Sequence, residues 1–274
     1  MLIYSNCKIC KSAVEPLIER KKIVWCKNCG LIFFQESLDE DEVKRIYEEL
    51  YNADDNAYSV HVNQGKQIES GIQPKISRGR NDILQKTLAP KPAKIAEIGA
   101  GVGIVGKYFT DRGYNYTGFE IDKHTAEGAR KNGINIENAP FEKLAEHKDE
   151  FDVLLAFEVI EHIDNLKLCL DLIYGSLKQN GRFGFTVPNF NKRNNYKGGD
   201  PEKLYQPNPP THVNFFTTQN INSVLPLSGF KIQFLKPQRF PQLYLTKFST
   251  YINIVKGLFG KFEGSTIMCI ACKE

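Results

Sequence analysis

The 274-residue sequence lacks any uncharged apolar run as long as a membrane span, and its first residues lack the apolar core of a signal peptide. It also has little net charge: 36 basic and 32 acidic residues leave +4, too small an excess to indicate nucleic-acid binding. A content of 41% hydrophobic and 25% charged residues excludes global disorder. We therefore expect a globular cytoplasmic protein with no nucleic-acid partner, whose seven cysteines are metal ligands or buried thiols rather than disulfides.

Four of the cysteines form two C-x-x-C pairs near the start of the sequence, Cys7 with Cys10 and Cys26 with Cys29. Each pair makes a tight knuckle whose two thiolates face one ion, and four thiolates suit one tetrahedral zinc with no position left open for catalysis. A segment of about thirty residues buries too little apolar surface to fold alone, so the metal would supply its stability. The spacing predicts a structural zinc ribbon over residues 1–35. The remaining cysteines are expected to be buried thiols: Cys169, Cys269 and Cys272.

A glycine-rich stretch at residues 96–106, A-E-I-G-A-G-V-G-I-V-G, separates two segments of different periodicity. The short apolar run 95–98 indicates a buried strand, and the spacing of apolar residues after Gly103 indicates a helix. Glycines are needed at such a turn because the backbone takes φ values that a Cβ disfavours and comes within contact distance of a ligand. The stretch therefore predicts a binding turn between a strand and a helix.

Two cofactor classes use a turn of this kind, and residues 101–106 do contain the G-x-G-x-x-G of dinucleotide-binding folds. Glu97, two residues before the first glycine, opposes a pyrophosphate and suits a cationic ligand. The string E-I-G-A-G-V-G resembles motif I of the class I S-adenosylmethionine (SAM) methyltransferases, whose ligand carries an ammonium and a sulfonium but no phosphate. This resemblance favours a SAM-dependent enzyme. The alternatives are a nicotinamide-dependent oxidoreductase and a catalytically silent SAM-fold binding protein, the latter opposed by the intact glycine turn.

Further strands are indicated at residues 116–120, 134–137, 151–158, 182–188 and 266–272, with helical segments between several of them. Alternating strands and helices imply a parallel sheet that binds ligands at the carboxyl ends of its strands. The resemblance covers residues 91 to about 236. It implies an α/β, Rossmann-like, doubly wound and mostly parallel seven-stranded sheet, in a methyltransferase domain over residues 91–274. Residues 36–90 are expected to form a helical linker and a lid.

The cofactor is expected to lie along the glycine turn and the ends of the next two strands. An acidic residue closing the second strand, Glu120, can accept hydrogen bonds from both ribose hydroxyls, and Glu97 would face the methionyl ammonium. In the methyltransferase family the loop after the third strand lies against the adenine, which implies this role for residues 139–141. The expected cofactor-binding residues are Glu97, Gly99, Ala100, Gly101, Gly103, Glu120, Ile121, Ala139, Pro140, Phe141 and Phe157.

Two histidines at the ends of neighbouring strands, His162 and His212, are the candidates to take the acceptor's proton, although each could instead be an ordinary hydrogen-bonded structural histidine. Glu158, Glu161 and His162 stand at i, i+3 and i+4, which on a helical turn places them on one face. The string F-E-V-I-E-H-I at 157–163 resembles that of ubiquinone-biosynthesis O-methyltransferases, and the zinc ribbon resembles that of sugar C-methyltransferases.

The E-x-x-E-H pattern with a later histidine is also similar to metal-dependent 2′-O-methyltransferases of small RNAs. That resemblance implies a divalent cation held by Glu158, Glu161, His162 and His212 beside the methyl group. In the alternative without metal, Glu158 ends the strand, Glu161 is a solvated carboxylate and His162 alone acts as the base. The expected reaction is O-methylation of a small-molecule, sugar or glycan hydroxyl.

Residues 237–263 form a basic and apolar insert before the last predicted strand, and no acidic residue occurs between Lys231 and Phe262. A basic segment rich in aromatic residues can lie on an anionic membrane surface. Packing on the core or a homodimer interface would use the same residues. The sequence leaves these three interpretations open.

Overall fold

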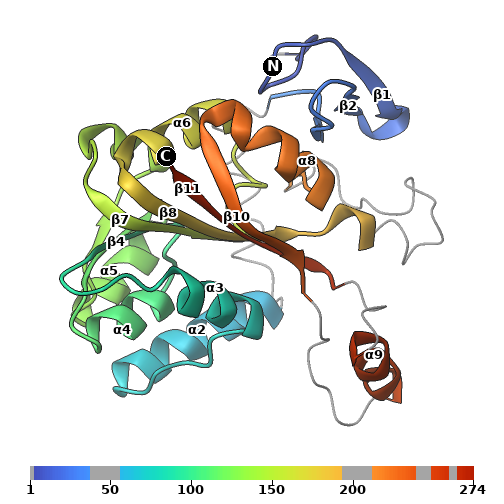
Figure 1. The fold of residues 1–274 in the computed structure, drawn as a ribbon. Helices are drawn as coiled ribbons and strands as arrows, with labels where there is room; N and C mark the ends of the chain where they lie inside the picture. Colours follow the sequence, from blue (N-terminus) through green and yellow to red (C-terminus); the bar gives the residue numbers. More distant parts are fainter. Residues whose placement is uncertain (1–2, 38–55, 193–211, 239–247, 259–263) are drawn as a thin grey trace.

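The computed structural model describes residues 3–37, 56–192, 212–238, 248–258 and 264–274. Its centre is a seven-stranded sheet in the order β10-β11-β8-β7-β4-β5-β6, and a four-stranded sheet near the N-terminus has the order β1-β2-β3-β9 (Figure 1). The strands are β1 (Val14–Ile18), β2 (Ile23–Cys26), β3 (Ile32–Phe34), β4 (Lys94–Ile98), β5 (Asn115–Glu120), β6 (Ile136–Asn138), β7 (Phe151–Phe157), β8 (Leu177–Pro188), β9 (Asn214–Phe215), β10 (Phe230–Pro237) and β11 (Thr266–Lys273).

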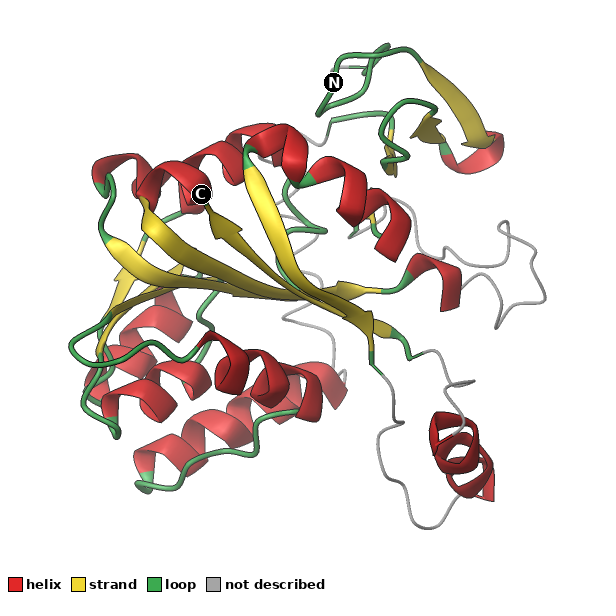
Figure 2. Cartoon of the chain, viewed as in Figure 1, coloured by secondary structure: helices red, strands yellow, loops and turns green. Residues whose placement is uncertain are grey.

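Helices cover both faces of the large sheet (Figure 2). The α-helices are α2 (Asn56–Glu69), α3 (Arg78–Thr87), α4 (Ile104–Thr110), α5 (Lys123–Lys131), α6 (Leu166–Ser176), α8 (Thr218–Val224) and α9 (Phe248–Leu258), and the 3₁₀ turns are η1 (Glu19–Lys21), η2 (Phe141–Glu146) and η4 (Pro226–Ser228). Side chains of α3, α4 and α5 belong to one apolar cluster, whereas those of η2, α6 and α8 belong to another. The predicted α/β sheet with helices on both sides is confirmed.

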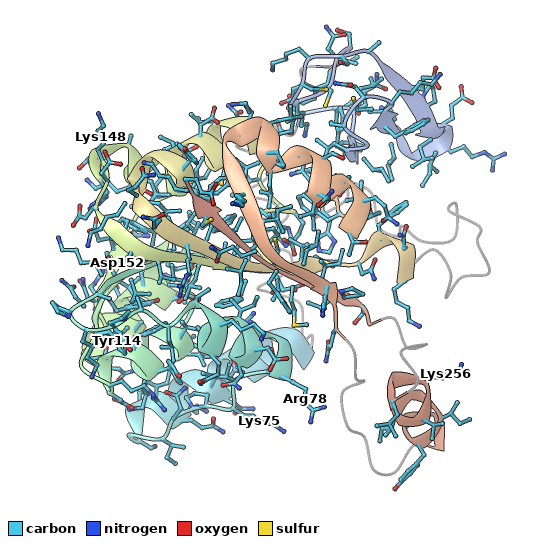
Figure 3. The ribbon with its side chains drawn as sticks, viewed as in Figure 1. Lys75, Arg78, Tyr114, Lys148, Asp152 and Lys256 are labelled. Carbon is cyan, nitrogen blue, oxygen red and sulfur yellow. The ribbon has the colours of Figure 1, made fainter. Side chains whose placement is uncertain are left out.

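Strands β4 to β8 are parallel, while β11 runs antiparallel to β8 and β10 antiparallel to β11. In the middle of the sheet, β4 and β7 read as apolar runs in the sequence because both of their faces are covered. Their amino ends lie at the side marked by Tyr114 and Asp152 in Figure 3, just before β5 and at the start of β7. The opposite, carboxyl ends carry the glycine turn, Glu120 and the loop after β7.

The cysteine ribbon is built into the rest of the molecule rather than attached by a linker alone. Its third strand pairs with β9, a two-residue strand from beyond the parallel sheet, through Ile32 opposite Phe215 and Phe33 opposite Asn214. Buried ribbon residues, among them Phe33, belong to the same apolar cluster as α6 and α8. Figure 1 shows α8 beside the ribbon.

The structure describes only part of two of the predicted segments. The linker and lid over 36–90 contains α2 and α3, and its segment 38–55 lies outside the described residues. The insert over 237–263 contains α9, on which Tyr251, Ile252, Val255 and Leu258 are exposed. Lys256 projects from the same helix (Figure 3). No helix within the described ranges has the length and apolar character needed to cross a bilayer.

Candidate active site

The turn after β4 has the backbone conformation that its glycines permit. Gly99, Gly101 and Gly103 all have positive φ, at 67°, 53° and 85°. A Cβ on Gly99 would lie 2.5 Å from Val159 Cγ2, and one on Gly103 would lie 2.7 Å from Ile134 Cδ1, so these two glycines allow close packing. A Cβ on Gly101 would meet nothing within 4 Å. The turn is thus packed on two sides and faces open space at Gly101, as a ligand cradle requires.

Glu120 ends β5 beside this turn, and backbone groups hold its carboxylate. Its Oε2 accepts a hydrogen bond from the Gly101 N–H at 2.8 Å, and its Oε1 accepts one from the Asp122 N–H at 2.9 Å. Burial raises the pKa of Glu120, and the two N–H donors oppose that rise. The predicted ribose-binding carboxylate is therefore fixed at the edge of the cradle.

Glu97, the other predicted acidic residue, is buried beneath the turn. Its Oε2 accepts a hydrogen bond from Tyr116 OH at 2.5 Å. Burial is the largest cause that raises the pKa of Glu97 to about 8; the Tyr116 hydrogen bond and Arg80 lower it, and Glu120 adds to the rise. A buried carboxyl beside a second carboxylate suits a cationic ligand without phosphate, which is the charge pattern of SAM.

Two neighbours of Glu97 were missed by the sequence analysis. Tyr116 lies on the adjacent strand β5, directly opposite Ile95, and Arg80 lies in the first turn of α3. The Arg80 guanidinium carbon stands 5.5 Å from the ring centroid of Phe157, a predicted cofactor residue at the end of β7. No sequence motif marks Arg80, because its position depends on how α3 packs against the sheet.

The predicted adenine side lies where β6 ends next to β5. The Ala139 N–H donates to the Glu120 carbonyl at 3.1 Å, and Asn138 Nδ2 donates to the carbonyls of Glu120 and Ile121. The Ile121 side chain is 55% exposed although it is large and apolar. The structure thus brings residues 139–141, which include Pro140 and Phe141, near Glu120 and leaves apolar surface beside it, consistent with the predicted contact with a flat aromatic base.

A cluster of one carboxylate and two imidazoles follows β7. One ligand atom each from Glu161, His162 and His212 lies within 4.8 Å of the others. The ring centroids of His162 and His212 are 4.7 Å apart, and Glu161 Oε1 lies 3.9 Å from His162 Nε2. Glu161 is 1% exposed, so the alternative of a solvated carboxylate is wrong.

The structure differs from the prediction at Glu158. This residue follows the last residue of β7 with φ +58°, and residues 160–162 form a turn rather than the expected helical turn over 158–162. Helical spacing at i, i+3 and i+4 therefore does not apply, and Glu158 lies outside the three-residue cluster. His212, predicted as a ligand from about fifty residues away in sequence, does join the cluster because β9 returns to the same loop: the N–H groups of Val213 and Asn214 donate to the Glu161 carbonyl at 2.8 and 3.0 Å.

The four ribbon cysteines converge as their spacing predicts. Cys7 Sγ lies 3.5 Å from Cys29 Sγ, Cys10 Sγ lies 3.4 Å from Cys26 Sγ, and the four sulfur atoms are within 4.8 Å of one another. Sulfur atoms each about 2.3 Å from a central zinc in a tetrahedron have this mutual spacing, so the donor set fits that ion. The other three cysteines are buried as predicted, and burial raises the pKa values of Cys169 and Cys269.

A family model described as a methyltransferase domain matches residues 68–233, which is more than half of the chain. A ubiquinone biosynthesis O-methyltransferase from Rickettsia felis is 26% identical over 154 residues, covering 53% of this chain and 59% of the relative. The protein of the same name from Rickettsia prowazekii is 30% identical over 116 residues, covering 40% of this chain and 43% of the relative. The chain thus spans less than two thirds of the length of these curated relatives.

Solved structures show the same fold. A putative SAM-dependent methyltransferase from Listeria monocytogenes aligns with a TM-score of 0.54 at 17% identity, over 72% of this chain and 97% of the other. A SAM-dependent methyltransferase from Thermotoga maritima, described as a possible histamine N-methyltransferase, aligns with a TM-score of 0.54 at 20% identity, over 85% of this chain and 100% of the other. The matched family model favours a methyltransferase over a nicotinamide-dependent oxidoreductase. The chain belongs to the methyltransferase domain family and has the fold of class I SAM-dependent methyltransferases.

Proposed function

We propose that this enzyme methylates a hydroxyl oxygen of a small molecule, a sugar or a glycan. The observation that carries the proposal is the cluster of Glu161 and His162, in the loop after β7 that abuts the cofactor turn, with His212, which lies just before β9. Val159, in the same loop, lies so close to Gly99 that a Cβ there would be 2.5 Å from its Cγ2. This closeness supports a role for the cluster's imidazoles as proton acceptors in O-methylation. The O-methyltransferase names of the relatives support the same reaction.

The chain's own residues would divide the work as follows. Glu97 and Glu120 would bind the methionyl ammonium and the ribose, which fixes the cofactor's direction across the turn. His162 or His212 would accept the proton of the acceptor hydroxyl, so that the oxygen attacks as it loses its hydrogen. The buried Glu161 carboxylate would stabilise the imidazolium that results. SAM supplies the electrophilic methyl group, and the protein supplies orientation and proton transfer.

We propose in addition that Glu161, His162 and His212 hold a divalent cation. One carboxylate and two imidazoles are ligands that suit Mn²⁺, Zn²⁺ or Mg²⁺ better than a thiolate-seeking metal. When bound, such a cation supplies Lewis-acid activation of the acceptor hydroxyl. Acceptors with two neighbouring oxygens, such as catechols and sugar diols, would fit a cation with open positions.

A structural zinc ion in the ribbon is the third part of the proposal. The convergence of four sulfur atoms supports it, and metal analysis of the purified protein tests it: we expect one zinc per chain that survives EDTA dialysis. A protein without bound zinc, or with zinc bound only at the histidine cluster, would contradict this assignment.

The methyl-transfer proposal is tested with isotopically labelled SAM and a panel of catechols, nucleotide sugars and glycans. We expect labelled product, abolished by His162→Ala, together with tight S-adenosylhomocysteine binding and no NAD binding by calorimetry. If activity survives EDTA dialysis while the ribbon zinc is retained, the reaction does not need the divalent cation. A histidine would then act as the base without a metal. Methyl transfer to nitrogen or carbon acceptors only would refute O-methylation.

A further inference from the structure

A buried lysine connects the cysteine ribbon to the acceptor side of the site. Lys8 follows the first cysteine, and its side chain is only 3% exposed. Its Nζ donates to Asp164 Oδ1 at 2.6 Å and stands 4.7 Å from the ring centroid of Tyr4 and 5.2 Å from that of Phe33. Tyr4 OH donates to the other oxygen, Asp164 Oδ2, at 2.7 Å. Both oxygens of Asp164 are thus held by ribbon residues, and Asp164 is two residues beyond His162.

A second connection reaches His212 from the other side of the ribbon. The Phe34 N–H at the end of β3 donates to the Val213 carbonyl at 2.9 Å, next to His212 in the chain. Asn220 Nδ2 in α8 donates to the Gly30 carbonyl at 3.3 Å and to the Phe215 carbonyl at 2.9 Å. The short strand that carries His212 into the site is therefore held between the ribbon and α8.

Both connections begin in the metal-binding knuckles. Lys8 lies between Cys7 and Cys10, while Gly30 directly follows Cys29 and donates its N–H to the Cys26 carbonyl at 2.8 Å. The conformation of each knuckle depends on its two sulfur atoms sharing an ion. An ion bound there would therefore set the place of Lys8 and of the strand β3 that follows Gly30.

We propose that the ribbon positions the acceptor half of the active site, with Lys8 and Asp164 as positioning residues that act through His162, and β3 acting through His212. The proposal rests on the methyl-transfer function assigned above. The cofactor half is held differently, by hydrogen bonds of Gly99 and Ala100 with Phe119 and of Gly101 with Glu120, all on β5 and the turn that follows β4. Loss of the Lys8–Asp164 pair therefore displaces the two histidines and leaves the cofactor cradle in place.

The test compares Lys8→Met with Lys27→Met in the full zinc-loaded chain. Lys27 is a matched control because it follows the first cysteine of the other knuckle, but its partner is the exposed Glu15, within the ribbon. Proton–carbon NMR of histidine-labelled protein at one pH reads the imidazoles directly, with His162 and His212 assigned by single substitution. We expect Lys8→Met to shift the signals of these two histidines and to leave His124 and His147 unchanged. Lys27→Met is expected to move none of the four.

Three further measurements separate positioning from general damage. S-adenosylhomocysteine affinity stays within about twofold in Lys8→Met, as for a substitution remote from the ligand. The zinc content stays at the wild-type level. Where Mn²⁺ binds the wild-type cluster, its affinity falls about 10- to 100-fold, the usual cost of losing a residue that orients metal ligands. Asp164→Asn removes the same ion pair from its half-buried side, and the double variant is expected to be no worse than either single one.

Unmoved His162 and His212 signals in both Lys8→Met and Asp164→Asn would overturn the proposal. So would shifts of His124 and His147 as well, together with lost cofactor binding, which would indicate a purely structural role. Asp164→Asn keeps the test available if Lys8→Met does not fold. A wild-type chain that binds no S-adenosylhomocysteine would refute the methyl-transfer function, whereas the histidine signals would still report whether the ribbon positions them.

Discussion

The raised pKa of Glu97 predicts that cofactor binding is linked to proton release. The free protein holds the Glu97 carboxyl with a pKa of about 8, because the group is buried and lies near Glu120. The ionised form is the one that pairs with the methionyl ammonium. Deprotonating the group at pH 6.5 costs about 2 kcal/mol, equivalent to about 30-fold in affinity, and this cost nearly vanishes above pH 8. Binding should therefore tighten as the pH rises.

The assay is calorimetry of S-adenosylhomocysteine binding at pH 6.5, 7.5 and 8.5, with Glu97→Gln as the matched control. The glutamine keeps an oxygen that accepts the Tyr116 hydrogen bond and has no proton to lose. The ligand's own amino group titrates in the same range, so the difference between the two proteins is the quantity of interest. We expect the wild-type affinity to gain about 20- to 30-fold more than that of Glu97→Gln between pH 6.5 and 8.5. Paired buffers of different ionisation enthalpy should show about one extra proton released at pH 6.5.

The same group also makes the free protein's stability depend on pH. The folded-state pKa lies above the value of about 4.5 for an unperturbed Glu, so between these values the folded state holds a proton that the unfolded state has lost. This contribution to the free energy of unfolding is complete below pH 4.5 and is lost at about 1.4 kcal/mol per pH unit as the pH rises toward 8. Between pH 6 and 7.5, urea unfolding should show a smaller loss of the free energy of unfolding for Glu97→Gln than for the wild type. Identical pH slopes in both binding and unfolding for the two proteins would refute the assignment of Glu97.

Three other expectations address the remaining parts of the site and the insert. Glu120→Ala should weaken S-adenosylmethionine binding by about 1.5–3 kcal/mol, or roughly ten- to a hundredfold, because one charged hydrogen-bonding partner is lost. Unchanged affinity in calorimetry would refute the ribose-binding role of Glu120. His212→Ala should abolish Mn²⁺ binding in electron paramagnetic resonance titrations without changing S-adenosylhomocysteine affinity, and retained Mn²⁺ binding would place the cation elsewhere. Flotation with anionic liposomes at low salt tests whether residues 237–263 bind a membrane surface. A protein that stays wholly in the soluble fraction, and that has a dimeric mass by light scattering, would favour a homodimer interface for these residues instead.

The parallel sheet could be predicted because its strands carry local signals. Strands buried on both faces appear as short apolar runs bounded by turns, and the glycine stretch marks the crossover between strand and helix. The structure places β4, β5 and β7 within one or two residues of the expected ranges. The two C-x-x-C pairs were equally informative, since ligand spacing is itself a local property.

The features that could not be predicted depend on pairings between distant parts of the chain. The two residues of β9 have no strand signal of their own and become a strand only by pairing with β3, some 180 residues earlier. Arg80 acts electrostatically on Glu97 because α3 packs against the sheet, and no spacing in the sequence encodes that proximity. At Glu158 a helical pattern was expected, but the chain leaves β7 in a left-handed conformation that ends any helical register.

The two halves of the active site therefore differ in how much of the fold they require. The cofactor half is made by consecutive strands and one turn, so its geometry follows from contacts between neighbouring elements. The acceptor half joins the loop after β7 to β9 and to the ribbon, whose Phe33 is fully buried in a cluster shared with Ile221 and Val224 of α8. Truncating a large buried aromatic residue such as Phe33 to alanine costs about 3–5 kcal/mol. Phe33→Ala should therefore weaken the packing between the ribbon and the acceptor loop. We expect amide hydrogen exchange to accelerate more at residues 212–216 than at β4. Uniform acceleration across both regions would show instead that the two halves unfold as one unit.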